Sequence, residues 1–190
     1  LSAASSAAYQ AVLKPVEGTI LTVCRQAAEA ARACAAEGGG LADVLRAARA
    51  AGRSALDQTP ELLPVLKDAG VVDAGGAGFL LLLDAALHVV DGEPLPEPET
   101  GVGPTLEQLE AAAHRHHDGT GLEPDVSELR YEVMYFLDLE DSRIEQFKQR
   151  WGEIGDSIVV VGGGGLWNCH VHTNDVGAAI EVALDLGGRP

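Results

Sequence analysis

The stretch VVDAGGAG, from Val71 to Gly78, predicts how the N-terminal half of the chain folds. Its glycines stand where an apolar helical pattern begins, and that pattern runs to Val90. Glycines at a helix start let a ligand approach the backbone, where the first-turn N–H groups and the positive end of the helix dipole favour a phosphate. Gly75 and Gly76 would equally allow two helices to cross closely. Because the stretch is neither a P-loop nor a dinucleotide fingerprint, the pattern alone leaves both interpretations open.

Toward the N-terminus, the spacing of apolar residues predicts further helices. They recur with helical period over residues 18–36 and again over residues 41–56, and three consecutive glycines separate the two runs. Thr59-Pro60-Glu61 is predicted to open a new short helix, because Thr is a frequent N-cap and Pro the favoured first residue. Antiparallel helices joined by short turns make a bundle. The chain starts at Leu1 inside this pattern and without a methionine, which is typical of a cut sequence.

A second candidate binding element lies at the start of the helix over residues 18–36. Pro15 breaks the preceding chain, and Thr19 falls in the first turn, where its hydroxyl can cap the helix or contact a phosphate. An ordinary helix start explains the same pattern.

Composition excludes several classes of function. The net charge of −16 repels phosphate backbones, so we expect no nucleic-acid partner, although a nucleotide site needs only local amides or a divalent ion. Three cysteines without a CxxC pair give no disulfide framework and favour a reducing compartment. No signal peptide and no uninterrupted apolar run of about 18 residues is present, so the sequence predicts a cytoplasmic protein without a membrane span.

The chain changes character twice. Residues 92–127 are acidic and punctuated by prolines, which predicts an exposed linker; residues 106–117 are a candidate short helix, and His114, His116 and His117 are more typical of a solvated segment than of a metal site.

Beyond the linker, strand patterns over residues 131–139, 157–161 and 166–172 alternate with helical patterns over 142–151 and 176–186. The order β-α-β-β-α indicates an α/β domain, and its few elements suggest truncation at this end too. The tetraglycine over residues 162–165 lacks the Lys and Ser/Thr of a phosphate loop and sits where a hairpin must turn.

The strand over residues 166–172 carries the third candidate site. Because strand side chains alternate, His170 and His172 should share one face while Cys169 points to the other. Two imidazoles two residues apart suit a metal or an acid/base pair, but a metal needs a third ligand. Asp175, at the start of the next helix, is predicted either to cap that helix or to join the histidines.

Taken together, these motifs resemble a known family. KPVEGTILTV (Lys14–Val23), TPELLPVLK (Thr59–Lys67) and AGVVDAGGAG (Ala69–Gly78) occur in the order found in the DhaL, or DAK2, domain of bacterial fatty-acid kinase catalytic subunits, relatives of the nucleotide-binding subunit of dihydroxyacetone (glycerone) kinase. GDSIVVV (Gly155–Val161) and HVHTNDVG (His170–Gly177) resemble the central domain of the same proteins. The resemblance covers most of the chain outside the linker.

The resemblance implies a fold, an activity and a partner. The fold is the C-terminal part of an all-α DhaL-type antiparallel helical barrel over residues 1–91, then the linker over 92–127, then the start of a central α/β domain over 128–190. The activity is phosphoryl transfer from Mg-ATP to a fatty acid carboxylate held by a separate acyl-binding protein, in phospholipid metabolism; the diverged kinase uses a dihydroxyacetone hydroxyl instead. Thr19, Asp73, Gly75 and Gly76 match the family's residues beside the nucleotide. The oligomeric state stays open, a homodimer included.

Two departures from the family pattern matter. The magnesium-binding aspartates are expected in a motif upstream of Leu1, so we predict that this chain by itself is inactive. Related central domains pair their two histidines with a cysteine in a YCTEF strand; aligning that strand with residues 132–136 puts Val133 in the cysteine's place. Valine cannot ligate, so the resemblance does not carry a Zn²⁺ site to His170 and His172, which remain candidate catalytic residues.

Two interpretations of other classes stay open. One is a metal-dependent hydrolase centred on His170, His172 and Asp175, which metal analysis would test. The other is a non-catalytic scaffold, which failure of the intact protein to bind ATP would favour.

Overall fold

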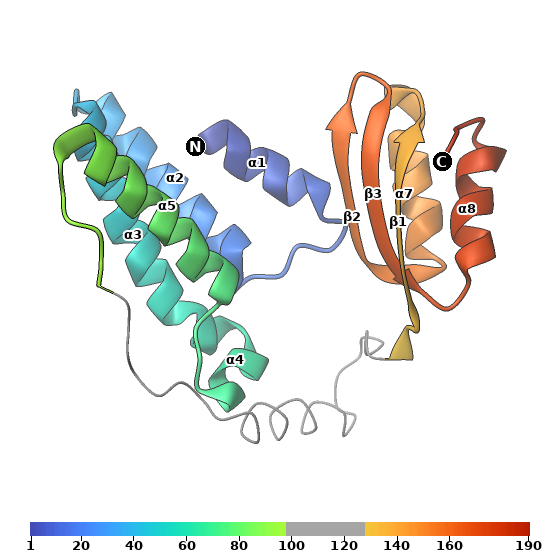
Figure 1. Cartoon of the computed structure of the whole chain (residues 1–190), viewed down its shortest axis with the longest axis horizontal. Helices are drawn as coiled ribbons and strands as arrows, with labels where there is room; N and C mark the ends of the chain where they lie inside the picture. The colour runs from blue at the N-terminus through green and yellow to red at the C-terminus, as the bar shows by residue number, and fades with distance from the viewer. Residues whose placement is uncertain (98–127) are drawn as a thin grey trace. The chain divides into compact units, whose positions relative to one another are not determined.

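The computed structural model describes residues 1–97 and 128–190, which group into two compact units. The first comprises residues 1–8 and 16–97, and the second residues 9–15 and 128–190. The first unit is helical, and the second is built on a small antiparallel sheet (Figure 1). The predicted helix at 106–117 and the histidines at 114, 116 and 117 lie outside the described residues.

The helical unit is organised around three helices that contact one another pairwise. These are α2 (Ile20–Ala36), α3 (Leu41–Leu62) and α5 (Ala74–Asp91), with the short α4 (Pro64–Ala69) between the last two. Helix α1 (Ser2–Ala11) begins in this unit, and its last residues, from Tyr9 on, belong to the second unit. Small residues let the helices approach closely: a Cβ at Gly52 of α3 would lie 2.7 Å from Leu80 of α5. The core is correspondingly rich in alanine, with leucines from α3 and α5 filling the remaining space.

The proposed helix start at Thr59-Pro60 is wrong, because α3 runs through Pro60 to Leu62. Proline removes the N–H that would bond to the carbonyl four residues earlier, that of Leu56. The Thr59 hydroxyl donates to this carbonyl instead, at 2.7 Å. The helix therefore continues for a short distance past Pro60 and ends before Leu63, and α4 begins at Pro64.

Helix α5 is apolar on more than one side. Leu80, Leu83 and Leu87 are buried, whereas Leu82 and Val89 are 68% and 83% exposed. By length and composition α5 is one helix among the described residues that would be long enough to cross a membrane, but the same test is passed by core helices of soluble proteins. Since α5 packs against both α2 and α3, we treat it as a helix of the bundle.

The second unit has the predicted element order β-α-β-β-α. Strands β1 (Tyr131–Asp138), β2 (Gly155–Gly163) and β3 (Leu166–Thr173) form an antiparallel sheet in the order β1-β3-β2. Helix α7 (Ile144–Gly152), preceded by the 3₁₀ turn η2 (Asp141–Arg143), and helix α8 (Val176–Asp185) complete it. The tetraglycine makes the β2–β3 turn as predicted; Gly164 and Gly165 have positive φ, and the Asp141 carboxylate accepts from both amides.

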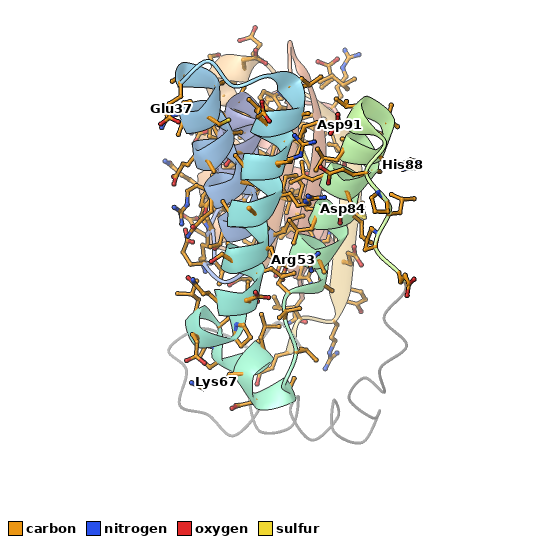
Figure 2. All side chains as sticks on the ribbon, turned by 90° about the vertical axis from the view of Figure 1, so that its left-hand side faces the viewer. Glu37, Arg53, Lys67, Asp84, His88 and Asp91 are labelled. Atoms are coloured by element: carbon orange, nitrogen blue, oxygen red, sulfur yellow. The ribbon has the colours of Figure 1, made fainter. Side chains whose placement is uncertain are left out.

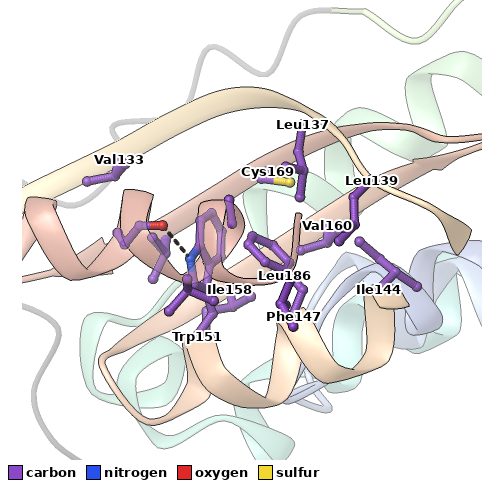
Figure 3. Packing of buried hydrophobic residues seen from close by; sticks show 14 residues of the cluster. Val133, Leu137, Leu139, Ile144, Phe147, Trp151, Ile158, Val160, Cys169 and Leu186 are labelled. Atoms are coloured by element: carbon purple, nitrogen blue, oxygen red, sulfur yellow. Dashed lines mark hydrogen bonds between the residues drawn. The ribbon is translucent and has the colours of Figure 1, made fainter. Parts of the chain in front are cut away.

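One face of the sheet is covered by α7 and α8. Phe147 and Trp151 of α7 are fully buried against inward-facing strand residues such as Leu137 and Cys169 (Figure 3). The Trp151 indole N–H donates to the Ala179 carbonyl of α8 at 2.9 Å, which fixes the two helices to each other. The opposite face carries the histidines described below.

Residues 9–15 extend the sheet at the β2 edge. Val12 forms an antiparallel bridge with Val159, and the Leu13 amide donates to the Ile158 carbonyl at 3.1 Å. Leu13 also packs on the core of this unit, and Lys148 of α7 donates to the Gln10 carbonyl. This short segment therefore protects an otherwise open strand edge.

Candidate functional site

Thr19 is the N-cap of α2. Its hydroxyl accepts a hydrogen bond from the Leu21 amide at 3.3 Å and donates one to the Val16 carbonyl at 2.8 Å. The cap fixes where the helix begins and leaves the Ile20 amide, the first of the helix, directed out of the N-terminus.

Asp73 has the same role at the start of α5. Its carboxylate accepts from the Gly76 amide at 2.6 Å, and its own amide donates to the buried Thr59 hydroxyl at 3.1 Å. The second bond ties the start of α5 to the end of α3. Because the Gly76 amide is engaged by Asp73, it is not free to bind a ligand in this conformation.

The structure brings these two helix starts together. A Cβ at Gly75 would lie 3.2 Å from the Ile20 Cβ, and one at Gly76 would lie 2.7 Å from Val23 of α2. The sequence-predicted residues Thr19, Asp73, Gly75 and Gly76 therefore lie at one end of the bundle. The close-crossing interpretation of Gly75 and Gly76 is confirmed, and the approach of a ligand to their backbone stays a prediction.

Three amides at this end have no acceptor within the described residues. They belong to the first residues of the two helices: Ile20, Ala74 and Gly75. Two adjacent helix N-termini place their dipoles' positive ends at one point, which is favourable for a phosphate or another anion.

The second candidate site lies on the uncovered face of the sheet. His170 and His172 project from β3 on one side, their ring centroids 5.0 Å apart, while Cys169 and Val171 are fully buried on the other. The predicted alternation is thus confirmed.

Glu132 of β1 completes a cluster with the two histidines. It pairs with His172 in the strand register, and its Oε1 lies 3.2 Å from the His170 Nδ1. One ligand atom from each of the three residues lies within 4.8 Å of the others, so two nitrogens and one oxygen can converge on a divalent cation. Val133, by contrast, is buried in the core, so Glu132 and not Val133 is the β1 residue that lies beside the histidines.

Sequence reasoning missed Glu132 although the signal was available. Two residues share a sheet face when they are paired in register, and a strand alignment shifted by one residue exchanges the faces. Aligning the strand from Tyr131 would have placed a carboxylate beside the histidines.

Two other acidic residues near the histidines have separate roles. Asp175 caps α8, accepting from the Ala178 amide at 2.9 Å. Asp156, paired in register with His172, accepts from the Lys14 ammonium at 3.0 Å and from the Ser157 amide at 2.6 Å. Partial burial raises the pKa of Asp156, but these hydrogen bonds lower it by more, so its pKa lies below the usual 3.8.

Comparison with known families agrees with this two-unit organisation. Residues 1–88 match the DAK2 domain, and residues 128–189 match the FakA-like middle domain of fatty acid kinases. These two domains define a kinase-related class. The chain belongs to the DhaL/DAK2 family in which a DAK2 domain is followed by a FakA-like middle domain.

Similar proteins come from Bacillus and Staphylococcus species. The chain is 35% identical to protein YloV of Bacillus subtilis over 191 residues, which cover 98% of the chain and 34% of that protein. It is 33% and 32% identical to uncharacterized proteins of Staphylococcus saprophyticus and Staphylococcus haemolyticus, in each case over 95% of the chain and 33% of the relative. The chain thus spans about a third of the length of the curated relatives it matches.

Proposed function

We propose that the protein containing this chain is a cytoplasmic ATP-dependent kinase that transfers the γ-phosphoryl group of Mg-ATP to a fatty acid carboxylate presented by an acyl-binding partner protein. In this proposal residues 1–91 are part of a DhaL-type helical barrel, residues 92–127 a linker and residues 128–190 the start of the central domain. A dihydroxyacetone hydroxyl is the alternative acceptor. The family supports kinase-related chemistry, and the acceptor and partner follow from the resemblance alone.

The observation that carries the proposal is the meeting of two helix N-termini, those of α2 and α5. The first amides of these helices, at Ile20, Ala74 and Gly75, have no acceptor in the described parts of the chain and fit the requirements of a phosphate group. Thr19 and Asp73 position these amides by capping the helices, and Gly75 lets the two helix starts approach. Mg-ATP, when bound, supplies the transferred group and the metal that neutralises its charge.

The described residues of this end are suited to the phosphates rather than to the metal. The Asp73 carboxylate is occupied as a cap, with its Oδ2 2.6 Å from the Gly76 amide. We therefore assign no magnesium ligand to it, in line with the expectation that the metal-binding aspartates belong to another part of the protein.

The sharpest test removes one amide without disturbing the helix. Ala74 is the first residue of α5, where proline is tolerated, and Asp73 has the extended backbone that precedes a proline readily. Ala74→Pro in the longer protein should weaken binding of a fluorescent ATP analogue about tenfold or more, because a charge-assisted hydrogen bond is lost. Val176→Pro, at the first residue of α8 behind the Asp175 cap, is the matched control and should bind normally.

Equal nucleotide affinity of the Ala74→Pro and Val176→Pro variants would show that the start of α5 does not bind the nucleotide. Failure of the longer protein to bind ATP at all would favour a scaffold. If ATP binds and is turned over without an acyl-loaded partner protein, the assignment as a kinase is kept and the fatty acid is rejected as the acceptor.

A second proposal concerns the middle domain, where Glu132, His170 and His172 are proposed to bind a divalent transition metal. The convergence of their ligand atoms supports it, since Glu132 supplies the third ligand that the histidines require. Metal analysis of the purified protein after exposure to Zn²⁺ or Mn²⁺ should find about one equivalent, lost in His172→Asn and retained in His88→Asn. Absence of bound metal would dispose of this site and of the metal-dependent hydrolase interpretation together.

A further inference from the structure

A pocket lies on the flank of the helical unit, away from the helix starts described above. It is lined by residues of α3, of α5 and of the extended segment that follows α5: Arg49, Ala50, Arg53, Asp84, Pro94 and Pro96. Its volume of about 360 Å³ is in the range of small-molecule sites. Asp84 is ten residues along α5 from Ala74, a rise of roughly 15 Å, so this pocket and the helix starts occupy different positions on α5.

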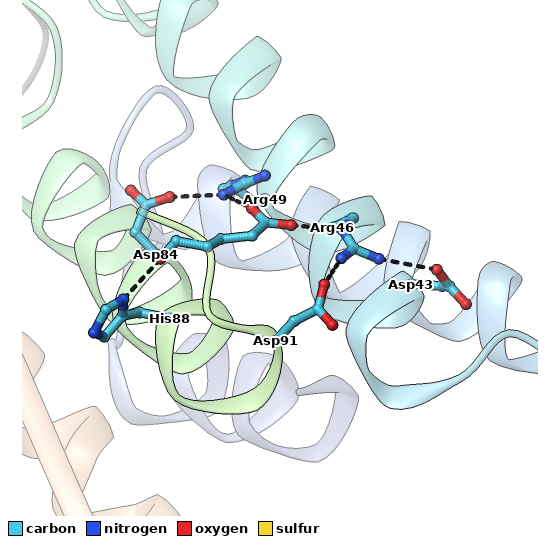
Figure 4. Close-up of polar contacts among 7 residues, drawn as sticks. Asp43, Arg46, Arg49, Asp84, His88 and Asp91 are labelled. Atoms are coloured by element: carbon cyan, nitrogen blue, oxygen red, sulfur yellow. Dashed lines mark hydrogen bonds and ion pairs between the residues drawn. The ribbon is translucent and has the colours of Figure 1, made fainter. Parts of the chain in front are cut away.

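The outer wall of the pocket is held in place by ion pairs. Glu93 receives hydrogen bonds or ion pairs from Arg46 at 2.6 Å and from Arg49 at 2.7 Å, while the His88 ring nitrogen contacts the Glu93 carbonyl at 2.7 Å (Figure 4). Asp91 adds a further contact to Arg46. Pro94 and Pro96 follow directly, so the pocket wall is a fixed part of the unit.

Asp84 is a buried acid that is only half satisfied. Its side chain is 7% exposed; Oδ1 accepts from Arg49 at 3.3 Å, but the buried Oδ2 has no hydrogen-bond partner among residues 1–97 and 128–190. Buried acceptors are paired in nearly all native proteins, so an orphaned carboxylate oxygen on a pocket wall indicates a missing donor.

Arg53 supplies the opposite charge to the same pocket. Figure 2 shows Arg53 and Asp84 on the side where α3 and α5 lie next to each other. Among the described residues no acidic side chain pairs with the Arg53 guanidinium, whereas Arg49 is shared between Asp84 and Glu93. Within the part of the chain that the structure describes, the pocket therefore offers the exposed Arg53 guanidinium, without an acidic partner, and one unpaired acceptor, beside the apolar surfaces of Ala50 and the two prolines.

We propose that this pocket binds a small hydroxylated organic anion, whose carboxylate or phosphate pairs with Arg53 and whose hydroxyl donates to Asp84. An anion without a donor would leave the Asp84 oxygen unpaired, and a neutral polyol would not make the charge-assisted hydrogen bonds that the solvent-exposed Arg53 guanidinium can donate to an anion. The site is independent of the proposed kinase chemistry, because it uses none of the residues at the helix starts.

Two three-carbon probes separate the parts of this proposal. D-glycerate carries a carboxylate and hydroxyls, whereas propionate has the carboxylate alone. Titration of the isotope-labelled 190-residue chain, followed by NMR through the backbone amide signal of the pocket residue Ala50, which every variant keeps, should show saturable D-glycerate binding at least tenfold tighter than propionate. Arg53→Gln should weaken D-glycerate at least tenfold, and Arg32→Gln, an equal change of charge on α2, should leave it unchanged.

Asp84→Asn keeps the size of the side chain and tests the second contact. It should reduce the preference for D-glycerate over propionate while the chain keeps its native spectrum. Equal binding of the two probes to the wild-type chain, absence of saturable shifts, or full binding by Arg53→Gln would each overturn the proposal.

Discussion

The Thr59 hydroxyl ties the end of α3 to the start of α5. It donates to the Leu56 carbonyl, which Pro60 deprives of its usual partner, and it accepts from the Asp73 amide. The Thr59 side chain and its bond to the Leu56 carbonyl are buried, and its bond from the Asp73 amide is part-buried, so removing the hydroxyl would leave both groups without their partner. One residue thus lets α3 pass a proline and fixes the start of α5.

Replacing this hydroxyl should be costly. Thr59→Val keeps the shape but leaves the buried Leu56 carbonyl and the part-buried Asp73 N–H unpaired, so we expect a loss of about 2 kcal/mol in the free energy of unfolding. Thr59→Ser, which keeps the hydroxyl and loses one methyl group, should lose only about 1 kcal/mol. Urea titration followed by circular dichroism measures both; a valine variant as stable as the serine variant would contradict the bridging role.

Asp156 gives a prediction for pH. Burial raises the pKa of Asp156, but the hydrogen bonds from Ser157 and Lys14 lower it by a larger amount. The net result is a pKa below the usual 3.8. A carboxylate whose folded pKa is depressed stabilises the fold above its unfolded pKa, and this contribution disappears as the pH falls through the folded value. Lys14→Met should move the pKa back up, as measured by NMR of the carboxyl carbon. Lys67→Met, which removes the same charge from the helical unit, should leave it unchanged.

At the scale of elements, periodicity predicted most of the structure. The helices over 20–36 and 74–91 and the β-α-β-β-α order follow from apolar spacing of 3.6 and 2. The helix start predicted at Thr59-Pro60 was wrong for a local reason. A Thr-Pro pair can cap a new helix or lie inside a longer one, and only the hydrogen-bond partner of the Thr59 hydroxyl distinguishes the two cases. For the same reason the anchoring of Val12 at the β2 edge was not foreseen: an isolated bridge leaves no period in the sequence.

The candidate sites divide in the same way. Spacing along a single strand sufficed to place His170 and His172 on one face, but Glu132 comes from a different strand, and only the register between strands brings it there. Likewise, sequence indicated that Thr19 and Asp73 begin helices, whereas the packing of Gly75 on Ile20 shows that these helices begin at the same end.

Two glycines of α5 test this packing directly. A Cβ at Gly76 would lie 2.7 Å from Val23 and 3.1 Å from Leu56, whereas one at Gly78 would meet nothing within 4 Å. Gly76→Ala should therefore lower the free energy of unfolding by about 1–3 kcal/mol through overpacking. Gly78→Ala should raise it by about 0.5–1 kcal/mol, because alanine favours the helix. Thermal unfolding that changes in the same direction for both variants would argue against the close α2–α5 contact.

At the scale of the whole molecule, the reactivity of the three free cysteines measures how well each of the two units protects its interior. Cys24 and Cys34 are half-buried in α2, and Cys169 is fully buried in β3. Burial raises the pKa of the Cys24 thiol, and it raises the pKa of Cys169 to about 12 from the usual 9.0. A raised thiol pKa means that the folded α/β unit keeps a proton that the unfolded chain releases, so its stability should fall as the pH rises above about 9.

The thiolate is the reactive form, so this difference should appear in alkylation rates. At pH 8 a thiol with a pKa near 12 is ionised on the order of a thousandfold less than an ordinary exposed one, before any steric protection is counted. Iodoacetamide labelling read by peptide mass spectrometry should therefore modify Cys34 in the native chain and leave Cys169 intact. In urea, Cys169 should become reactive together with loss of the sheet signal, because Trp151 and Phe147 must separate from β3 to expose it. Labelling of native Cys169 at the rate of Cys34 would show that the core of this unit opens without unfolding.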